Sequence, residues 1–209
     1  MKTYQTDKIR NIALIGNGGS GKTTLAEAML FEGGVIERRG TVNGNNTVSD
    51  YNEIEHENLN SVFSTVLYTE INDHKINIID TPGADDYIGG VISSFSVVDL
   101  AVMLINSQQG VEVGTEILNR HCDRYHKPLM FVVNRLDHEN ANFEKTLESL
   151  KTTFGNKAVV VQYPIDTGAN FNAIIDVITM KMYKFADGKT EVADIPADQM
   201  ATAEDYHNT

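Results

Sequence analysis

Residues 16–23, GNGGSGKT, form a phosphate-binding motif. They match G-x-x-x-x-G-K-[ST] at every fixed position, with an apolar run before them and a helical pattern after them. The glycines allow successive N–H groups to point inward and form an anion nest at the start of the next helix. We expect Lys22 to contact the β- and γ-phosphates of a nucleotide and the Thr23 hydroxyl to bind Mg²⁺. The predicted nucleotide contacts here are Gly16, Asn17, Gly18, Gly19, Ser20, Gly21, Lys22, Thr23 and Thr24. The alternative is a glycine-rich turn that binds nothing.

The tetrapeptide DTPG at 80–83 follows the apolar run 75–80. Asp80 would therefore lie at the carboxyl edge of the predicted sheet, where it would hold Mg²⁺, through a water molecule. Gly83 has no Cβ, so its N–H can approach and sense a γ-phosphate. Alone the tetrapeptide could be an ordinary turn. Downstream of a phosphate loop, the pattern favours a metal and phosphate sensor.

A base-recognition motif, NRLD, ends the apolar run at 134–137. The carboxylate of Asp137 can accept hydrogen bonds from N1–H and the exocyclic amine of guanine, whereas adenine has no proton on N1. Such a site can discriminate between guanine and adenine nucleotides by a factor of roughly 10⁴ or more. We expect Asn134 to tie this loop to the phosphate loop and Arg135 to lay its aliphatic stem against the base. Arg in place of the usual Lys predicts guanine specificity with altered affinity. The alternative is a polar turn after a strand.

The elements that carry these motifs alternate between strand and helix. Apolar runs at 9–16, 75–80, 100–106, 128–134 and 158–164 are typical of strands buried on both faces. Helical periodicity covers 23–32, 115–126 and 143–154. The half-polar stretch 61–73 predicts an antiparallel partner for 75–80. The fold class is therefore α/β: a doubly wound, mostly parallel sheet with one antiparallel edge strand and helices on both faces.

The remaining segments predict loops and a terminal addition. Residues 33–60 are too long and polar for a passive connection, which favours a functional or mobile loop. Residues 180–195 predict a hairpin turning at Asp187–Gly188, followed by a helix near Pro196. We assign 1–179 to the core domain and 180–209 to the start of an insertion.

Composition limits the partners. With 209 residues and a net charge of −12, the chain predicts one acidic domain without non-specific nucleic-acid binding. No stretch predicts a signal peptide or membrane span, so we expect a cytoplasmic monomer with no membrane contact. The single cysteine, Cys122, is interpreted as structural.

The order of GNGGSGKTT, TVSDYNEIEHENLNSV, DTPGADDYIGGV and NRLDHENANF resembles the translational GTPases, and elongation factor G most closely. FEKTLESLKTTF and YPIDTGANFNAIIDVITMKMY extend the resemblance over essentially the whole chain. It implies a P-loop NTPase G domain that uses GTP/GDP and Mg²⁺ and acts with the ribosome. It also implies that 33–60 is switch I, that 80–96 is switch II, and that Ser61 supplies the hydroxyl that completes the Mg²⁺ shell.

Three features depart from the pattern of that family. Ala84 replaces the His that orients the attacking water, so hydrolysis, to which Lys22 and Gly83 would contribute, should be weak or lost. Gly19 replaces a common Asp, and 58–62 reads NLNSV instead of R-G-I-T-I. The S-A-x guanine motif is not recognisable, so we expect the last strand and helix of the domain to lie outside the chain. No histidine can be placed as a substitute catalyst.

Two other functions stay open at this point. If the chain is a P-loop kinase or ATPase, 134–137 is only a turn. ATP would then displace bound GDP as effectively as GTP does. A binding scaffold or regulatory protein would bind nucleotide without effective hydrolysis, or bind none.

Overall fold

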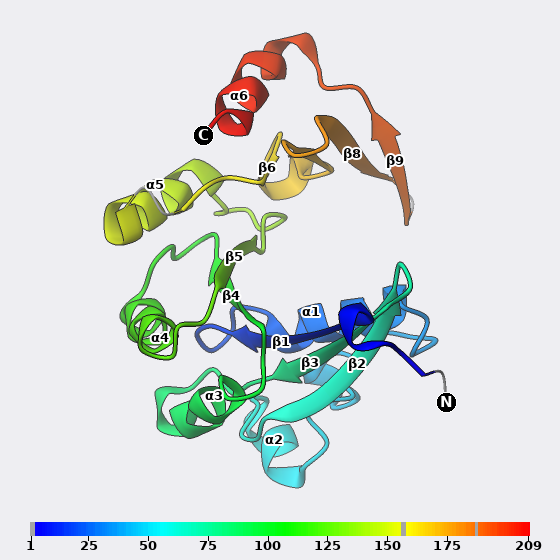
Figure 1. The fold of residues 1–209 in the computed structure, drawn as a ribbon, viewed down its shortest axis with the longest axis vertical. Coiled ribbons are helices and arrows are strands. Elements are labelled where there is room, and N and C mark those ends of the chain that lie inside the picture. Colours follow the sequence, from blue (N-terminus) through cyan, green and yellow to red (C-terminus); the bar gives the residue numbers. More distant parts are fainter. Residues whose placement is uncertain (1–2, 156–157, 187) are drawn as a thin grey trace. The chain divides into compact units, whose positions relative to one another are not determined.

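The structure is a computed structural model that describes residues 3–155, 158–186 and 188–209. It divides into two compact units. The first unit consists of Met1–Asn106 and Glu112–Asn134, and the second of Ser107–Val111 and Arg135–Thr209. Each unit contains its own sheet (Figure 1).

The first unit is built on a five-stranded sheet in the order β2-β3-β1-β4-β5. Strands β3, β1, β4 and β5 are parallel, and β2 joins β3 antiparallel at the edge. The predicted fold class, with its single antiparallel edge strand, is confirmed. The strands are β1 (Ile9–Ile15), β2 (Thr65–Ile71), β3 (His74–Asp80), β4 (Leu100–Asn106) and β5 (Leu129–Asn134), and the helices are α1 (Lys22–Glu32), α2 (Glu53–Asn58), α3 (Ile88–Ser94) and α4 (Val113–Arg124).

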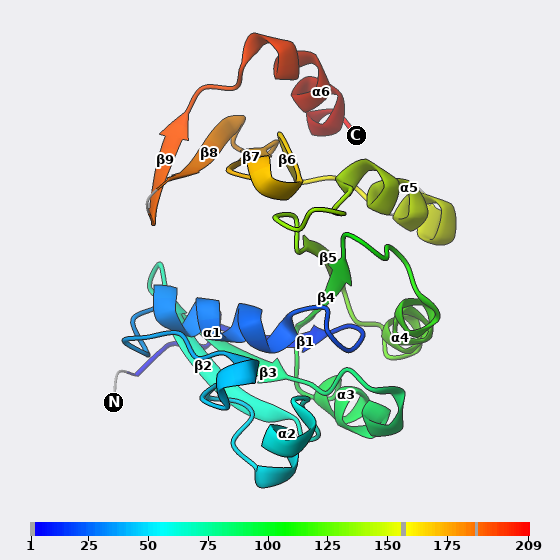
Figure 2. The ribbon, with the colours of Figure 1, turned by 180° about the vertical axis from the view of Figure 1, so that it is seen from behind.

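Helices cover both faces of this sheet. Helix α1 lies in front of β1 and β3 in Figure 2 and behind them in Figure 1. Its Ala26 and Leu30 form a buried cluster with Leu14, Ile78 and Leu104. The alternate residues of β1 and β4 point to the opposite face, where α3 contacts β1 and α4 contacts β4. Each fully buried leucine here contributes roughly 1.5–3 kcal/mol to stability.

Strand β2 alternates in burial as its sequence predicts. Leu67 and Thr69 are buried, whereas Val66 and Tyr68 are exposed. Thr69 also donates a 3.0 Å hydrogen bond to the carbonyl of Met29 in α1, which fixes the helix against the edge strand. Cys122 is a buried free thiol whose pKa is raised to about 11 by burial. The charged thiolate is therefore disfavoured, which agrees with a structural residue.

The second unit contains an antiparallel sheet in the order β6-β7-β8-β9. Its elements are α5 (Phe143–Phe154), β6 (Gln162–Pro164), β7 (Ala173–Asp176), β8 (Lys181–Ala186), β9 (Lys189–Ala193) and α6 (Ala197–His207). Strands β8 and β9 pair as the predicted hairpin, although Asp187 lies outside the described residues. The helix expected near Pro196 is α6, which starts one residue later.

One strand prediction is wrong. The run 158–164 predicts a strand buried on both faces of the main sheet, but only Gln162–Pro164 is a strand, and it pairs antiparallel with β7. Val159 and Val161 are exposed. An apolar run specifies the strand tendency of a segment, whereas its pairing partner depends on tertiary contacts. Among the described residues, none of the helices has the length and apolarity needed to cross a membrane.

Candidate functional site

Two glycines of the phosphate loop have backbone conformations and surroundings that exclude side chains. Gly16 has φ +136°, and a Cβ on it would lie 2.5 Å from the Leu104 carbonyl oxygen. Gly21 has φ +98°, and a Cβ there would collide with the Asn134 side chain. The loop therefore packs directly on β4 and β5, which holds it at the carboxyl edge of the sheet.

The loop opens onto the start of α1. Gly21 is the N-cap and supplies no side-chain hydrogen bond, so the first-turn N–H groups have no side-chain cap. Gly18 and Gly19 are exposed, and a Cβ on Gly19 would meet nothing within 4 Å. Thr24 is exposed on the first turn, and Asn17 is partly buried. The arrangement is an uncapped helix N-terminus with room for an anion.

Lys22 is buried beneath this loop. Its Nζ donates to the carbonyl oxygens of Gly16 (2.8 Å) and Asn17 (3.0 Å). Burial lowers the pKa of Lys22 to about 8, and the charges of Asp80 and Asp50 oppose the decrease. Most of the lysine is therefore protonated at pH 7. The main chain of Gly83 lies close by, because a Cβ on Gly83 would be 2.5 Å from Lys22 Nζ.

Asp80 and Thr23 form the centre of a buried polar cluster. Thr23 Oγ1 donates to Asp80 Oδ2 at 2.8 Å, and Ser49 Oγ donates to the same oxygen at 2.8 Å. Ser61 Oγ lies 3.2 Å from Thr23 Oγ1. Burial raises the pKa of Asp80 to about 6, against the hydrogen bonds from Ser49 and Thr23 and the charge of Lys22. The structure thus brings together the three residues predicted to bind metal: Thr23, Ser61 and Asp80.

Ser49 and Asp50 belong to this cluster and were not predicted from the sequence. Asp50 is buried, and neither of its carboxylate oxygens has a hydrogen-bond partner among the described residues. Burial raises its pKa, and the nearby Ser61 hydroxyl partly offsets the rise. Both residues lie in the segment 47–62 that carries part of the family resemblance, but no metal-binding role was assigned to them. A polar residue in a long loop gives no signal of its own, and only the folded loop places it beside Asp80.

The cluster fits a hard divalent cation. Mg²⁺ prefers oxygen ligands and is usually held by one or two carboxylates, waters and substrate phosphates. Asp80 Oδ1 and both oxygens of Asp50 are buried without partners in the described chain, and each such oxygen is costly unless a cation or donor satisfies it. The described residues contain no group of three or more His, Cys, Asp or Glu suited to a metal, so hydroxyls and substrate would complete the shell.

The base-recognition motif is divided between the two units. In the first unit, Asn134 Nδ2 donates to the Ser20 carbonyl at 2.9 Å, which ties the end of β5 to the phosphate loop. The Ser20 hydroxyl itself is buried without a hydrogen-bond partner in the described chain.

In the second unit, Arg135 and Asp137 are exposed on a braced loop. Arg135 adopts a left-handed φ of 60°, and its carbonyl accepts from Ser107 Oγ at 2.9 Å. The Leu136 carbonyl accepts from the Gly168 N–H at 2.7 Å. Asp137 follows this braced position and is an exposed residue.

Ala84 follows Gly83 in the lining of a small pocket. The polar side chains that line it are Asn17 and Asp85, and no described histidine does so. The aliphatic and glycine part of the lining consists of Gly16, Pro82, Gly83, Ala84, Ile88, Val91, Gly114, Ile117 and Leu118. Asn17 is directed towards the start of α4, since a Cβ on Gly114 would meet its Oδ1. The pocket therefore holds no imidazole where the family pattern places one.

Known proteins share this sequence and fold. Residues 7–201 match the family described as the elongation factor Tu GTP binding domain. Elongation factor G from Mycoplasma genitalium is 36% identical over 192 residues, which cover 92% of this chain and 28% of the relative. An elongation factor G-like protein from Thermotoga maritima is 35% identical over 188 residues, covering 90% of this chain and 27% of the relative.

A solved structure agrees in fold. The crystal structure of a protein from Thermus thermophilus matches with a TM-score of 0.90 and 31% identity, covering 96% of this chain and 30% of that chain. The chain thus spans less than a third of the length of these relatives. It belongs to the elongation factor Tu GTP-binding domain family of translational GTPases, and within that superfamily it is similar to elongation factor G.

Proposed function

We propose that this chain binds GTP and GDP with Mg²⁺ as the nucleotide-binding domain of an elongation factor G-like translation factor that acts on the ribosome. The observation that carries the proposal is the buried cluster of Lys22, Thr23 and Asp80 at the uncapped start of α1. A buried lysine and a buried carboxylate that influence each other's charge, with Asp80 Oδ1 lacking a partner in the described chain, are suited to a bound phosphate and a divalent cation.

The residues that would hold Mg²⁺ are Thr23, Ser61 and Asp80, with Ser49 and Asp50 beside them. When bound, the ion would supply positive charge that neutralises the negative charge of the phosphates. The protein's own contribution is to keep Asp80 ionised: hydrogen bonds from Ser49 and Thr23 and the Lys22 charge all oppose the pKa rise caused by burial. Lys22 and the N–H of Gly83 would stabilise the charge on the γ-phosphate.

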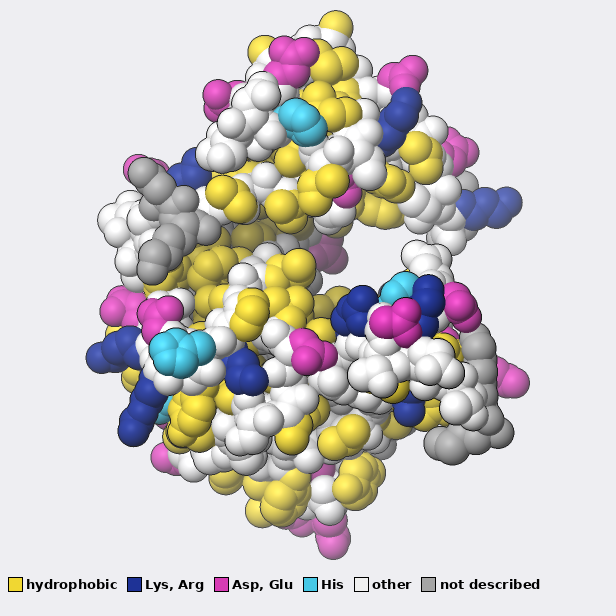
Figure 3. Space-filling view, in the orientation of Figure 1, with side chains coloured by type: hydrophobic (Ala, Val, Ile, Leu, Met, Phe, Trp, Pro, Cys, Tyr) yellow, Lys and Arg dark blue, Asp and Glu magenta, His cyan; other side chains and the backbone are white. Residues whose placement is uncertain are grey.

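Guanine selectivity is assigned to Asp137, with Asn134 supporting the loop and the Arg135 stem against the base. The Asn134 bond to the Ser20 carbonyl supports this assignment, because it joins the end of β5 to the phosphate loop within one unit. The full-length protein would have the ribosome as a partner. On the face drawn in Figure 3, Lys and Arg side chains are interspersed with Asp and Glu, which argues against non-specific nucleic-acid binding by this acidic chain.

A specific observation favours a second candidate, a GTP-binding regulatory protein with little hydrolysis of its own. The pocket beside Gly83 has Ala84 where the family pattern has His, and Asn17 and Asp85 are the polar side chains of its described lining. A positioned proton-transfer or orienting group contributes about 10²–10⁴ in rate. We infer that intrinsic hydrolysis is slowed by a factor of that order.

Two measurements test these proposals. Displacement of a fluorescent GDP analogue from the chain in Mg²⁺ should occur with GTP and GDP but not with ATP; equal displacement by ATP would instead support a kinase or ATPase. Phosphate release by the full-length protein, with and without ribosomes, should separate the two candidates. Stimulation to ordinary elongation-factor rates would show that Ala84 is compensated, and no stimulation would favour the regulatory protein.

A further inference from the structure

Two buried glutamates lie outside the phosphate and cation clusters. Glu27 in α1 and Glu55 in α2 are each 1% exposed. Burying a carboxylate is costly unless hydrogen-bond donors satisfy it, so the donors around each one indicate its purpose. In both cases most of the donors are main-chain N–H groups of the 33–63 segment.

Glu27 clamps the first half of this segment. Its Oε2 accepts from the Gly40 N–H at 2.7 Å, and its Oε1 accepts from the Val48 N–H at 2.6 Å. The intervening chain folds back on itself, because the Thr41 N–H donates to Asn46 Oδ1 at 2.8 Å. One carboxylate on α1 therefore holds both ends of a compact turn at 40–48.

Glu55 clamps the second half. Its Oε1 accepts from the N–H groups of Val62 (3.0 Å) and Phe63 (3.1 Å). Its Oε2 accepts from the N–H and the Nδ2 of Asn52, at 3.2 and 2.9 Å. Burial alone would raise the pKa of Glu55, but these donors outweigh it and the pKa is lowered. The side chain is thus a charged acceptor that joins the start of α2 to the chain after it.

Each glutamate holds one amide that is adjacent to a residue of the cation cluster. Val48, held by Glu27, precedes Ser49, whose hydroxyl bonds to Asp80. Val62, held by Glu55, follows Ser61, whose hydroxyl lies 3.2 Å from that of Thr23. A bond to an ionised acceptor is roughly twice as strong as a neutral one, so these clamps fix the backbone next to the cluster.

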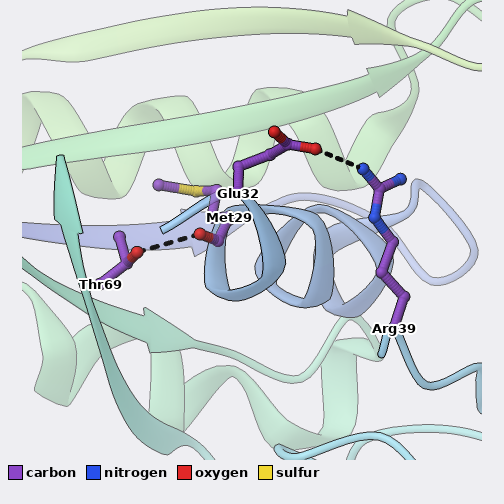
Figure 4. Close-up of polar contacts among 4 residues, drawn as sticks. All are labelled: Met29, Glu32, Arg39 and Thr69. Atoms are coloured by element: carbon purple, nitrogen blue, oxygen red, sulfur yellow. Dashed lines mark hydrogen bonds and ion pairs between the residues drawn. The ribbon is translucent and has the colours of Figure 1, made fainter. Parts of the chain in front are cut away.

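A third contact with α1 is weaker. Figure 4 shows Arg39 reaching Glu32, while Thr69 of β2 bonds to the Met29 carbonyl. The Arg39–Glu32 pair is 2.9 Å long, but its side chains are 51% and 66% exposed. Exposed ion pairs contribute about 0–1 kcal/mol. Of the two α1 glutamates that contact this segment, the buried Glu27 is therefore the one that holds it.

We propose that Glu27 and Glu55 are positioning residues that present Ser49, Asp50 and Ser61 to the cation site by holding the main chain on either side of it. This inference rests on the proposed function for the identity of the cation. Supports that orient metal ligands typically change metal affinity by 10–100-fold when they are lost.

The test uses near-isosteric variants, Glu27→Gln and Glu55→Gln, in which an NH₂ group replaces an acceptor oxygen. The matched controls are Glu32→Gln on α1 and Glu53→Gln, the exposed first residue of α2. Hydrogen exchange of the chain should rise at least tenfold over 40–50 in Glu27→Gln and over 60–64 in Glu55→Gln. Exchange in β4 is the reference for global folding and should not change.

The second readout is Mn²⁺ affinity in the presence of GDP, measured by electron paramagnetic resonance. We expect it to fall about tenfold in both test variants and to stay unchanged in both controls. If β4 exchange rises as well, Glu27→Asp, which keeps the charge and withdraws the carboxylate by one methylene, replaces Glu27→Gln.

The outcomes separate this inference from the proposed function. Unchanged exchange over 40–50 and 60–64 would overturn the inference, and so would faster exchange with unchanged Mn²⁺ affinity. If the unmodified chain bound no Mn²⁺ with GDP, the proposed function would fail. The exchange result alone would then decide whether the two glutamates hold the segment.

Discussion

At the scale of single residues, Ala84 makes the clearest functional prediction. Replacing it with His places an imidazole next to Gly83, beside a pocket whose described polar side chains are Asn17 and Asp85. We expect Ala84→His to raise single-turnover GTP hydrolysis by about 10². The measurement is phosphate release after rapid mixing with Mg²⁺. GDP affinity serves as the control and should not change; an unaltered rate would mean that the imidazole does not reach the attacking water.

Asp80 predicts a pH dependence of stability. Its folded pKa of about 6 lies above the unfolded value of about 3.9, so between these pH values the folded state binds more protons. The contribution of Asp80 to stability therefore falls as pH rises from about 4 to about 6. Asp80→Asn removes this loss. In EDTA, the free energy of unfolding of the variant, relative to that of the wild type, should rise by about 1–3 kcal/mol between about pH 4 and about pH 6. The slope should be about 1.4 kcal/mol per pH unit.

Urea unfolding at pH 4.5, 5.5, 6.5 and 7.5 measures the Asp80 effect. The gain should level off above pH 6.5, where the wild-type carboxyl is already ionised in both states. A difference between the two proteins that stays constant with pH would contradict the assigned burial and charge of Asp80.

The residues of the site were predictable where a motif fixes their spacing. Lys22, Thr23 and Asp80 meet as expected, because strand and helix termini place motif residues at one sheet edge. Ser49 and Asp50 were missed because they reach Asp80 from a loop whose path no periodicity encodes. The assignment of nucleotide contacts to individual residues stays a prediction.

At the scale of elements, the N-terminus of α5 offers a stability test. Asn142 is its N-cap, and the side chain accepts from the Lys145 N–H at 2.8 Å. Asn142→Ala leaves that N–H without its cap and should cost about 1 kcal/mol of unfolding free energy. Asn142→Asp keeps an acceptor and should unfold near the wild-type midpoint. Equal destabilisation by Ala and Asp would show that the cap is not the cause.

Long periodic elements were predicted more accurately than pairing partners. Helix α5 has the expected bounds, and α1 begins one residue early, because 3.6-residue periodicity and flanking turn residues define helices locally. The prediction of a main-sheet strand at 158–164 was wrong because its valines fit an exposed connection as well as a strand. The short strand that forms there pairs with β7. The short helix α2 inside 33–60 was also missed, although Asn52 and Glu55 have the spacing of a helix start.

At the scale of the whole chain, the resemblance to elongation factor G and the comparisons agree on family and fold. The predicted boundary between a core at 1–179 and an insertion at 180–209 stays a prediction. The net charge of −12 favours recognition through defined surfaces over general attraction to RNA phosphates. Nucleotide identity is thus the property on which the account depends.

The most direct test of this account is the base preference of Asp137→Asn. Competition against a fluorescent GDP analogue should show that the wild-type chain prefers GDP to xanthosine diphosphate. In the wild type, the Asp137 carboxylate accepts a hydrogen bond from the exocyclic amine of guanine. In the variant, the Asn amide can donate a hydrogen bond to the xanthine oxygen at the same position. The variant should therefore prefer xanthosine diphosphate, and the ratio of the two affinities should change by at least 10². Unfolding midpoints control for folding. An unchanged preference for GDP in the variant would contradict the assignment of Asp137 and, with it, the proposed guanine nucleotide site.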